Sequence, residues 1–148
     1  MEFVCINGNF LHADQPLFTA QNRSFRYGDG VFETMKVYQS AILLEQLHFE
    51  RLFLGLKMLQ IENSSQASEM VQLVLELCEK NNCINLARVR LAVFRSQQNK
   101  AEFVIEASPL TEEVIYWNDK GLTIDLYPYA RKNTDAFSNL KTANFDNG

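Results

Sequence analysis

The chain has 148 residues, 47% of them hydrophobic and 22% charged, which is typical of one soluble globular domain with an apolar core. A formal net charge of −4, with no run of lysine or arginine, argues against binding to nucleic acid or to an anionic membrane. Three cysteines and two histidines lack the spacing of a disulfide framework or a zinc site, and no signal peptide is visible. We therefore expect no metal and a cytoplasmic location.

Short strands are predicted at the start of the chain. The apolar residues Phe3–Ile6 run into the turn sequence Asn7-Gly8-Asn9, and residues 10–11 resume the apolar pattern, which predicts a hairpin. Residues 31–38 alternate between two faces, which predicts a strand, and residues 41–44 form a second short apolar run. One face of the longer strand carries Val31, Glu33, Met35 and Val37.

The hydrophobic period then changes to that of a helix. Apolar residues in 47–59 recur at i, i+3, i+4, i+7 and i+10, as on one face of an amphipathic helix. They are Phe49, Leu52, Phe53, Leu56 and Leu59. Similar spacing returns over residues 70–80, and the cluster Asn63-Ser64-Ser65 between the two segments offers helix N-caps. We therefore predict two amphipathic helices in succession.

Strand patterns return after the second helix, at residues 86–94, 103–107 and 121–127. Strands, two helices and strands in this order predict an α+β fold, with an antiparallel sheet and two helices packed on one face. From residue 128 the sequence turns polar, as domain boundaries do. We predict a small α+β domain over residues 1–127, and an interdomain linker with the start of a second domain over 128–148.

Four motifs occur along the chain in the order that is found in one enzyme family. They are RYGDGVFET at 26–34, His48-Phe49-Glu50-Arg51-Leu52, the arginine-bearing strand at 87–95 and Lys141-Thr142-Ala143-Asn144. Together they resemble the fold-type IV pyridoxal-phosphate enzymes, or class IV aminotransferases, which include D-amino acid and branched-chain aminotransferases and aminodeoxychorismate lyase. Because the chain covers about half of a family member, the resemblance implies a small N-terminal domain, a second, larger domain and a homodimer.

The resemblance implies that two positions hold the cofactor. Lys141 would be the catalytic lysine, which forms a Schiff base with the aldehyde of pyridoxal 5'-phosphate and later moves a proton. On composition alone, Lys141 is an ordinary exposed lysine in a polar segment. Arg51 resembles the family arginine that binds the cofactor phosphate, because a planar guanidinium can bind two phosphate oxygens. The alternative for Arg51 is a solvated helix arginine paired with Glu50 or with another neighbour.

Four further positions are predicted to contact the substrate. Arg90 and Arg95 lie on the strand where relatives place an arginine for the substrate carboxylate, near Arg90 in the branched-chain type and near Arg95 in the D-amino acid type. Strand alternation puts the two arginines on opposite faces, so we expect only one of them to face the pocket. Tyr27 and Phe32 resemble aromatic residues that line the substrate pocket, and a place in the hydrophobic core is the alternative for both.

The two acids near this motif receive no catalytic role from the sequence. Asp29 lies between two glycines and is expected to organise a turn through its own backbone. Glu33 lies on the predicted strand that follows.

The activity implied by the resemblance is transfer of an amino group between an amino acid and a 2-oxo acid. The spacing Lys-x-x-Asn, in place of the Lys-x-Gly-Gly-Asn-Tyr of branched-chain relatives, favours the D-amino acid aminotransferase and lyase branches. A lyase that eliminates pyruvate from 4-amino-4-deoxychorismate is the first alternative, and a non-catalytic fragment or interaction domain is the second. Relatives contact the pyridine nitrogen with a glutamate beyond the lysine, which these residues lack, so we expect a longer chain.

Overall fold

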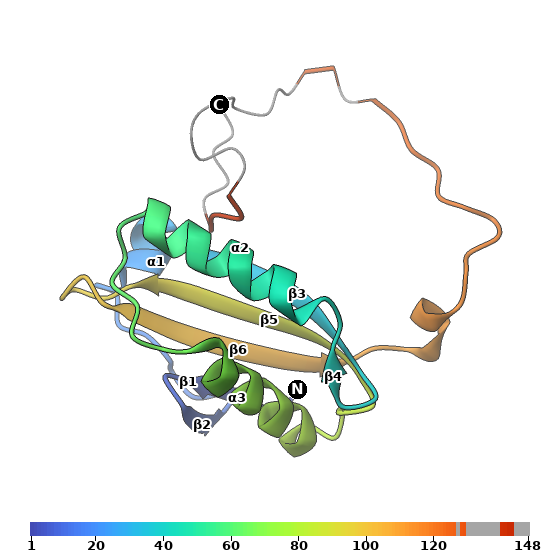
Figure 1. The fold of residues 1–148 in the computed structure, drawn as a ribbon, viewed down its shortest axis with the longest axis horizontal. Helices are drawn as coiled ribbons and strands as arrows, with labels where there is room; N and C mark the ends of the chain where they lie inside the picture. The colour runs from blue at the N-terminus through green and yellow to red at the C-terminus, as the bar shows by residue number, and fades with distance from the viewer. Residues whose placement is uncertain (127, 130–139, 144–148) are drawn as a thin grey trace.

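The computed structural model describes residues 1–126, 128–129 and 140–143 (Figure 1). Its strands are β1 Phe3–Ile6, β2 Asn9–His12, β3 Gly30–Tyr38, β4 Ala41–Ile42, β5 Leu86–Arg95 and β6 Ala101–Pro109. Its helices are α1 Arg23–Tyr27, α2 Glu45–Met58, α3 Ala67–Lys80 and a short 3-10 helix at Glu112–Ile115. No helix in the described ranges has both the length and the apolar character needed to cross a membrane.

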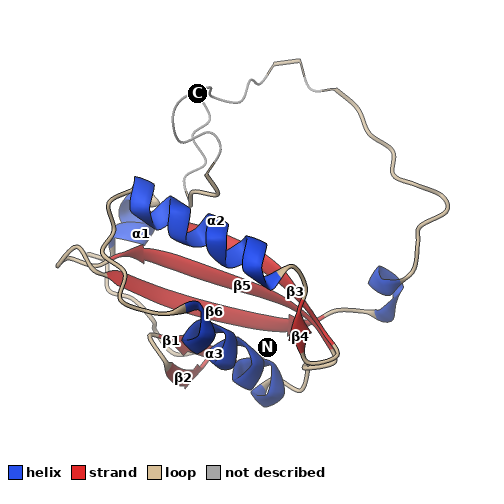
Figure 2. Ribbon diagram, in the orientation of Figure 1, coloured by secondary structure: helices blue, strands red, loops and turns tan. Residues whose placement is uncertain are grey.

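The six strands form one sheet in the order β2-β1-β6-β5-β3-β4, and every neighbouring pair is antiparallel. Helices α2 and α3 cover the same face of this sheet (Figures 1 and 2). The predicted α+β class, with an antiparallel sheet and two helices on one face, is therefore confirmed. The remaining helix, α1, has only five residues and lies beside the start of β3.

The hydrophobic core lies between the sheet and the two long helices. Alternate residues of the long strands β3 and β5 point into it, as expected for strands with one face covered. The buried core side chains of β3, β5, α2 and α3 are Val31, Met35, Val37, Phe49, Leu52, Leu56, Met70, Val74, Leu77, Cys78, Ala87, Val89, Leu91 and Val93. A fully buried aliphatic side chain stabilises the fold by about 1.5–3 kcal/mol relative to an exposed one.

Asn81 joins the end of α3 to the sheet. Its Oδ1 accepts hydrogen bonds from the backbone N–H groups of Glu2 and Phe3, at 3.1 and 2.8 Å. Its Nδ2 donates to the carbonyls of Phe3 and Ala107, at 2.9 and 3.0 Å. One side chain therefore satisfies backbone groups of both β1 and β6, which a helix-ending asparagine alone does not predict.

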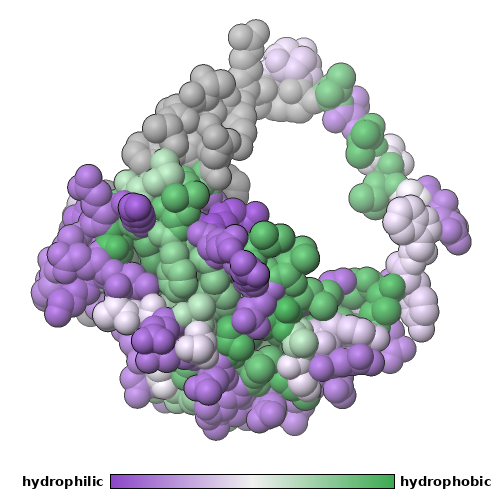
Figure 3. Space-filling model, in the orientation of Figure 1, coloured by the Kyte–Doolittle hydropathy of each residue, from purple (hydrophilic) through white to green (hydrophobic). Residues whose placement is uncertain are grey.

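One predicted strand is absent from the described residues, and another apolar run forms a shorter strand than its length allows. Residues 121–126 form no strand, and their alternating apolar side chains are exposed on a segment that stands away from the sheet (Figures 1 and 3). A segment with an alternating pattern becomes a strand only where the backbone of a neighbouring strand hydrogen-bonds to it. No described strand pairs with residues 121–126. The second run, 41–44, contributes only Ala41–Ile42 to the sheet, because Leu44 takes a left-handed conformation at the start of α2.

Some predicted features lie outside the described residues. Of the linker and second domain expected over 128–148, the structure describes residues 128–129 and 140–143. Tyr127, the last residue of the third predicted strand run, and Asn144 of the Lys-x-x-Asn motif are not described.

Candidate functional site

A buried carboxylate, Glu33, is the centre of the candidate site. Its side chain is 1% exposed and points from β3 toward α2, in line with the apolar residues of that face. Arg51 donates to it from Nε and from Nη2, at 2.6 Å each, to Oε1 and Oε2. The Nδ1 atom of His48 lies 2.8 Å from Oε2. His48 and Arg51 reach the same carboxylate because residues three apart lie on one side of a helix.

Charge and hydrogen bonding are balanced at Glu33. Burial by itself would raise the pKa of this carboxyl, but the hydrogen bonds from Arg51 and His48, with the positive charges of Arg51 and Lys141, hold the pKa below its usual value. The hydrogen bond to Glu33 in turn raises the pKa of the Arg51 guanidinium, which outweighs its partial desolvation. A carboxylate only accepts hydrogen bonds, so Nδ1 of His48 carries the proton. Arg51 is paired with Glu33 and not with Glu50, which accepts from Gln46.

Lys141 approaches Glu33 because its segment pairs with the open edge of β3. The N–H of Phe32 donates to the Lys141 carbonyl at 2.9 Å, and the N–H of Ala143 donates to the Gly30 carbonyl at 3.0 Å. The amine of Lys141 then lies 4.0 Å from Oε2 of Glu33 and 5.1 Å from the centre of the Phe32 ring. Two parts of the chain that are distant in sequence thus meet at one carboxylate.

Phe32 connects Lys141 to Arg90 on the neighbouring strand. The Arg90 guanidinium lies 4.9 Å from the centre of the Phe32 ring, and its Nη1 donates to Oε2 of Glu106 at 3.1 Å. Both cations are within the range of a cation–π contact with the same ring. The structure therefore brings together Lys141, Phe32 and Arg90, and it joins Arg51 to them through Glu33.

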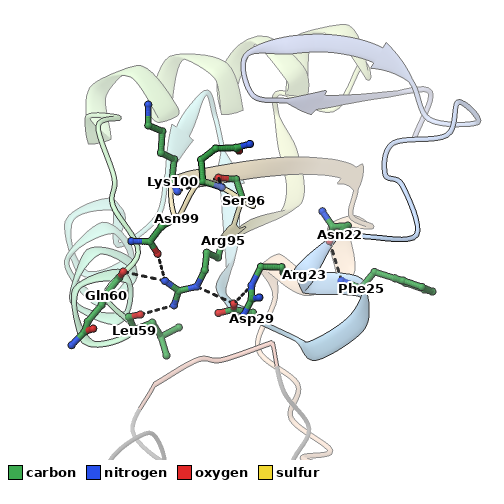
Figure 4. Close-up of polar contacts among 11 residues, drawn as sticks. Asn22, Arg23, Phe25, Asp29, Leu59, Gln60, Arg95, Ser96, Asn99 and Lys100 are labelled. Atoms are coloured by element: carbon green, nitrogen blue, oxygen red, sulfur yellow. Dashed lines mark hydrogen bonds and ion pairs between the residues drawn. The ribbon is translucent and has the colours of Figure 1, made fainter.

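Tyr27 and Arg95 lie apart from this cluster. Tyr27 ends α1, is 52% exposed, and has the Arg23 and Arg26 guanidinium groups each 5.4 Å from its ring centre, so it is not a core residue. Arg95 binds Asp29 and the region after α2 instead (Figure 4). No contact within the described part of the chain links either residue to Glu33.

Neither Asp29 nor Glu33 receives a catalytic role from the sequence, yet both organise charged clusters. The Asp29 carboxylate accepts from Nε of Arg23 at 2.7 Å and from Nε of Arg95 at 2.9 Å, so its side chain bridges two arginines. The backbone also turns at Asp29, since the Gly30 N–H donates to the Gly28 carbonyl at 2.9 Å. Burial would raise the Asp29 pKa, but these two arginines hold it below its usual value. For Glu33, the available signal was a carboxylate on an otherwise apolar strand face, between Val31 and Met35.

A cavity of about 260 Å³ lies next to the Asp29 cluster, between residues 17–23 and the turn at 95–98. Arg23, Arg95 and Glu102 contribute to its mixed polar lining, which includes none of the residues around Glu33. Within the described ranges, no three cysteine, histidine, aspartate or glutamate side chains lie close enough to hold a metal ion.

A family model that matches most of the sequence decides which family the chain belongs to. The family model of amino-transferase class IV matches residues 30–148, which include Glu33, Arg51, Arg90 and Lys141. The chain belongs to the class IV aminotransferase family. The resemblance carried by the four sequence motifs is therefore confirmed.

Several curated proteins are similar to this class IV chain. A D-alanine aminotransferase of Staphylococcus epidermidis is 27% identical over 57% of this chain and 30% of its own length. An aminodeoxychorismate lyase of Bacillus subtilis is 33% identical over 61% of this chain and 31% of its own. A putative branched-chain-amino-acid aminotransferase of Methanocaldococcus jannaschii is 32% identical over 62% of this chain and 32% of its own length. The chain thus matches about a third of the length of these relatives.

Solved structures of branched-chain aminotransferases share the fold. The Escherichia coli branched-chain amino acid aminotransferase matches with a TM-score of 0.67 and 20% identity, over 74% of this chain and 41% of that one. A second match is a hypothetical aminotransferase from Mycobacterium tuberculosis, in a form with alpha-ketoglutarate and PMP bound. Its TM-score is 0.63 and its identity 22%, over 76% of this chain and 41% of that one. At such identities, the likeness concerns the fold alone.

Proposed function

We propose that this chain supplies part of a pyridoxal-phosphate site that transfers an amino group between an amino acid and a 2-oxo acid. The observation that carries the proposal is the placement of Arg51 Nη2 and Lys141 Nζ at 2.6 and 4.0 Å from the same oxygen of buried Glu33. A phosphate-binding group and a reactive amine are what a phosphorylated aldehyde requires. Membership of the class IV family supports pyridoxal 5'-phosphate as the cofactor.

The residues of the Glu33 cluster fit this cofactor chemically. Arg51 is held by Glu33 through Nε and Nη2, while Nη1 makes no hydrogen bond to any described residue and the side chain is 48% exposed. It can therefore bind phosphate without leaving Glu33. The Lys141 side chain is 34% exposed, so an aldehyde can approach it from solvent.

Each residue then has a distinct role. Pyridoxal phosphate, when bound, supplies an aldehyde for the amine and a ring that stabilises negative charge at the substrate α-carbon. Lys141 would hold the cofactor covalently and, once released from it, move a proton at that α-carbon through Nζ. Arg51 would bind the phosphate, and Glu33 would fix the orientation of Arg51.

On the substrate side, Arg90 is our candidate for binding the substrate carboxylate. One of its N–H groups binds Glu106, the side chain is 40% exposed, and it shares the Phe32 ring with Lys141. Phe32 would form a wall between these two cations. Exposed Tyr27, with its phenol available, would contact the substrate from α1, and Arg95 is the competing candidate for the carboxylate.

A lyase on the same scaffold is the second candidate function. The Bacillus subtilis aminodeoxychorismate lyase is 33% identical to this chain in its matched region, against 26–28% for the D-alanine aminotransferases. The two activities are separated by assaying pyruvate release from aminodeoxychorismate against formation of a new amino acid from a 2-oxo acid.

The proposal is tested by titrating the purified protein with pyridoxal 5'-phosphate and recording its visible absorbance and both activities. We expect Lys141→Ala to abolish the absorbance and the activity, and Lys120→Ala, a change in an exposed loop, to leave both unchanged. A protein that stays colourless with added cofactor would instead be a non-catalytic fragment or interaction domain. We further propose a homodimer in the cytoplasm, to be measured by light scattering and cell fractionation.

A further inference from the structure

We infer that Asp29 and Arg95 form a clamp that positions the loop at residues 27–30 against the C-terminal end of helix α2. Arg95 then holds this loop and the helix end in position, and Arg90 is the residue that binds the substrate carboxylate. The consequence for substrate rests on the proposed function, whereas the clamp itself does not.

Arg95 uses most of its hydrogen-bonding capacity inside the protein. Its Nε donates to Oδ2 of Asp29 at 2.9 Å, and its Nη2 donates to the Leu59 carbonyl at 2.6 Å. Its Nη1 donates to the Gln60 carbonyl at 3.1 Å and to Oδ1 of Asn99 (Figure 4). A guanidinium has five N–H groups, and four of them are occupied here. No pair of parallel N–H groups remains for a carboxylate, so binding one would break an existing contact.

Two of these contacts close the end of α2. The helix runs over Glu45–Met58, Leu59 is its C-cap, and Gln60 follows in a left-handed conformation with a φ of 56°. Carbonyls at a helix C-terminus lack intrahelical donors and carry partial negative charge, which a guanidinium satisfies on both counts. Arg95 therefore fixes the end of the helix that carries Arg51.

The other contact holds the loop before β3. Asp29 is 14% exposed at its side chain and binds Arg23 of α1 as well as Arg95, and its carbonyl accepts from the Arg95 N–H at 3.1 Å. Gly30 presses directly on β5, since a Cβ there would lie 2.4 Å from the Val93 carbonyl oxygen. The loop, α1 and the end of α2 are thus tied to the last residue of β5.

Arg90, unlike Arg95, has several guanidinium N–H groups that are available to a ligand. Among the described residues, the only hydrogen bond of its side chain is to half-exposed Glu106, and the other guanidinium N–H groups make none. It also shares the Phe32 ring with the Lys141 amine. A carboxylate attached to the α-carbon that reacts near Lys141 must lie near that amine, which favours Arg90.

Hydrogen exchange of the full chain tests the clamp without any activity. We expect Arg95→Gln to speed exchange of the backbone amides at 28–30 and at 59–61 together. The matched change Arg88→Gln, at an exposed arginine of the same strand, should alter neither segment. Asp29→Ala should speed exchange at 28–30 and, combined with Arg95→Gln, add little at that segment. If Arg95→Gln fails to fold, Arg95→Lys replaces it, and unchanged exchange in both segments would overturn the clamp.

Kinetics with and without the substrate carboxylate test the assignment of Arg90. We expect Arg90→Gln to lower kcat/KM for an amino acid by about 10- to 100-fold, the value of a charge-assisted hydrogen bond, while sparing the amine that lacks the carboxylate. Arg95→Gln should lower kcat/KM for the amino acid and for the amine by the same factor. If Arg95→Gln instead lowered kcat/KM for the amino acid and left that for the amine unchanged, the assignment would be overturned. A wild type without activity would refute the proposed function, and the exchange data would still decide the clamp.

Discussion

The amine of Lys141 lies 4.0 Å from Oε2 of Glu33, a carboxylate that is 1% exposed and accepts two hydrogen bonds from Arg51. This relationship places a lysine from the end of the chain beside a helix arginine that is far from it in sequence. Glu33 is the residue through which the two proposed cofactor-binding groups are joined. Changes at Glu33 should therefore affect stability and cofactor binding together.

Glu33→Gln should lower the free energy of unfolding by about 1–3 kcal/mol, because the amide leaves Arg51 without its carboxylate partner. Half of Arg51 is in solvent, which keeps the loss below that of a fully buried ion pair. Denaturant unfolding measures the change. Glu106→Gln, at the half-exposed partner of Arg90, is the control and should cost less than about 1 kcal/mol. Equal losses in the two variants would contradict the central place of Glu33.

Stability should fall as the pH drops below about 4. The folded pKa values of Glu33 and Asp29 lie below those of the unfolded chain, so the stabilisation is complete above the ordinary carboxyl pKa of about 4 and is lost as pH falls through the lowered folded values. Unfolding measured from pH 7 to pH 3 should show a smaller loss in Glu33→Gln than in the wild type. An identical pH slope in the two proteins would show that Glu33 is not held as described.

Gly30→Ala should destabilise the protein by about 1–3 kcal/mol or more, because the new Cβ meets backbone atoms of β5 that cannot move aside. Gly121→Ala provides a contrast, since a Cβ there meets no atom within 4 Å and the cost is only that of a left-handed residue, about 1 kcal/mol. Thermal unfolding separates the two. A Gly30→Ala protein as stable as Gly121→Ala would mean that the loop does not rest on β5.

Asn81→Ala should cost about 2–4 kcal/mol, because it leaves three backbone groups of β1 and β6, and the N–H of Glu2, without their partners. Asn118→Ala, which removes an asparagine from an exposed turn, should change stability by less than about 0.5 kcal/mol. Chemical denaturation of both variants makes the comparison. Similar midpoints would show that Asn81 does not join α3 to the sheet.

Periodicity in the sequence predicts the long elements well, because α2 and α3 bury an apolar stripe and β3 and β5 alternate against it. It fails where the outcome depends on a partner. Residues 121–126 have a strand pattern but no neighbouring strand among the described residues. The five-residue helix α1 carries no stripe, and it depends on Asn22 as N-cap and on left-handed Gly28 as C-cap.

The site was predictable by residue type but not by arrangement. The motifs predict Lys141 and Arg51 as cofactor residues, yet nothing in their spacing shows that Glu33 joins them, because that contact depends on tertiary packing of β3, α2 and residues 141–143. Arg90 and Arg95 look alike in sequence. Only the acceptors around each guanidinium distinguish an available arginine from an occupied one.

The most direct test of the Lys141 proposal is reductive labelling. The purified protein is incubated with pyridoxal 5'-phosphate, reduced with sodium borohydride, digested and mapped by mass spectrometry. We predict one modified lysine, Lys141, with loss of the label when inorganic phosphate competes and when Arg51 is changed to Gln. Labelling spread over exposed lysines such as Lys120, with Lys141 unmodified, would contradict the account.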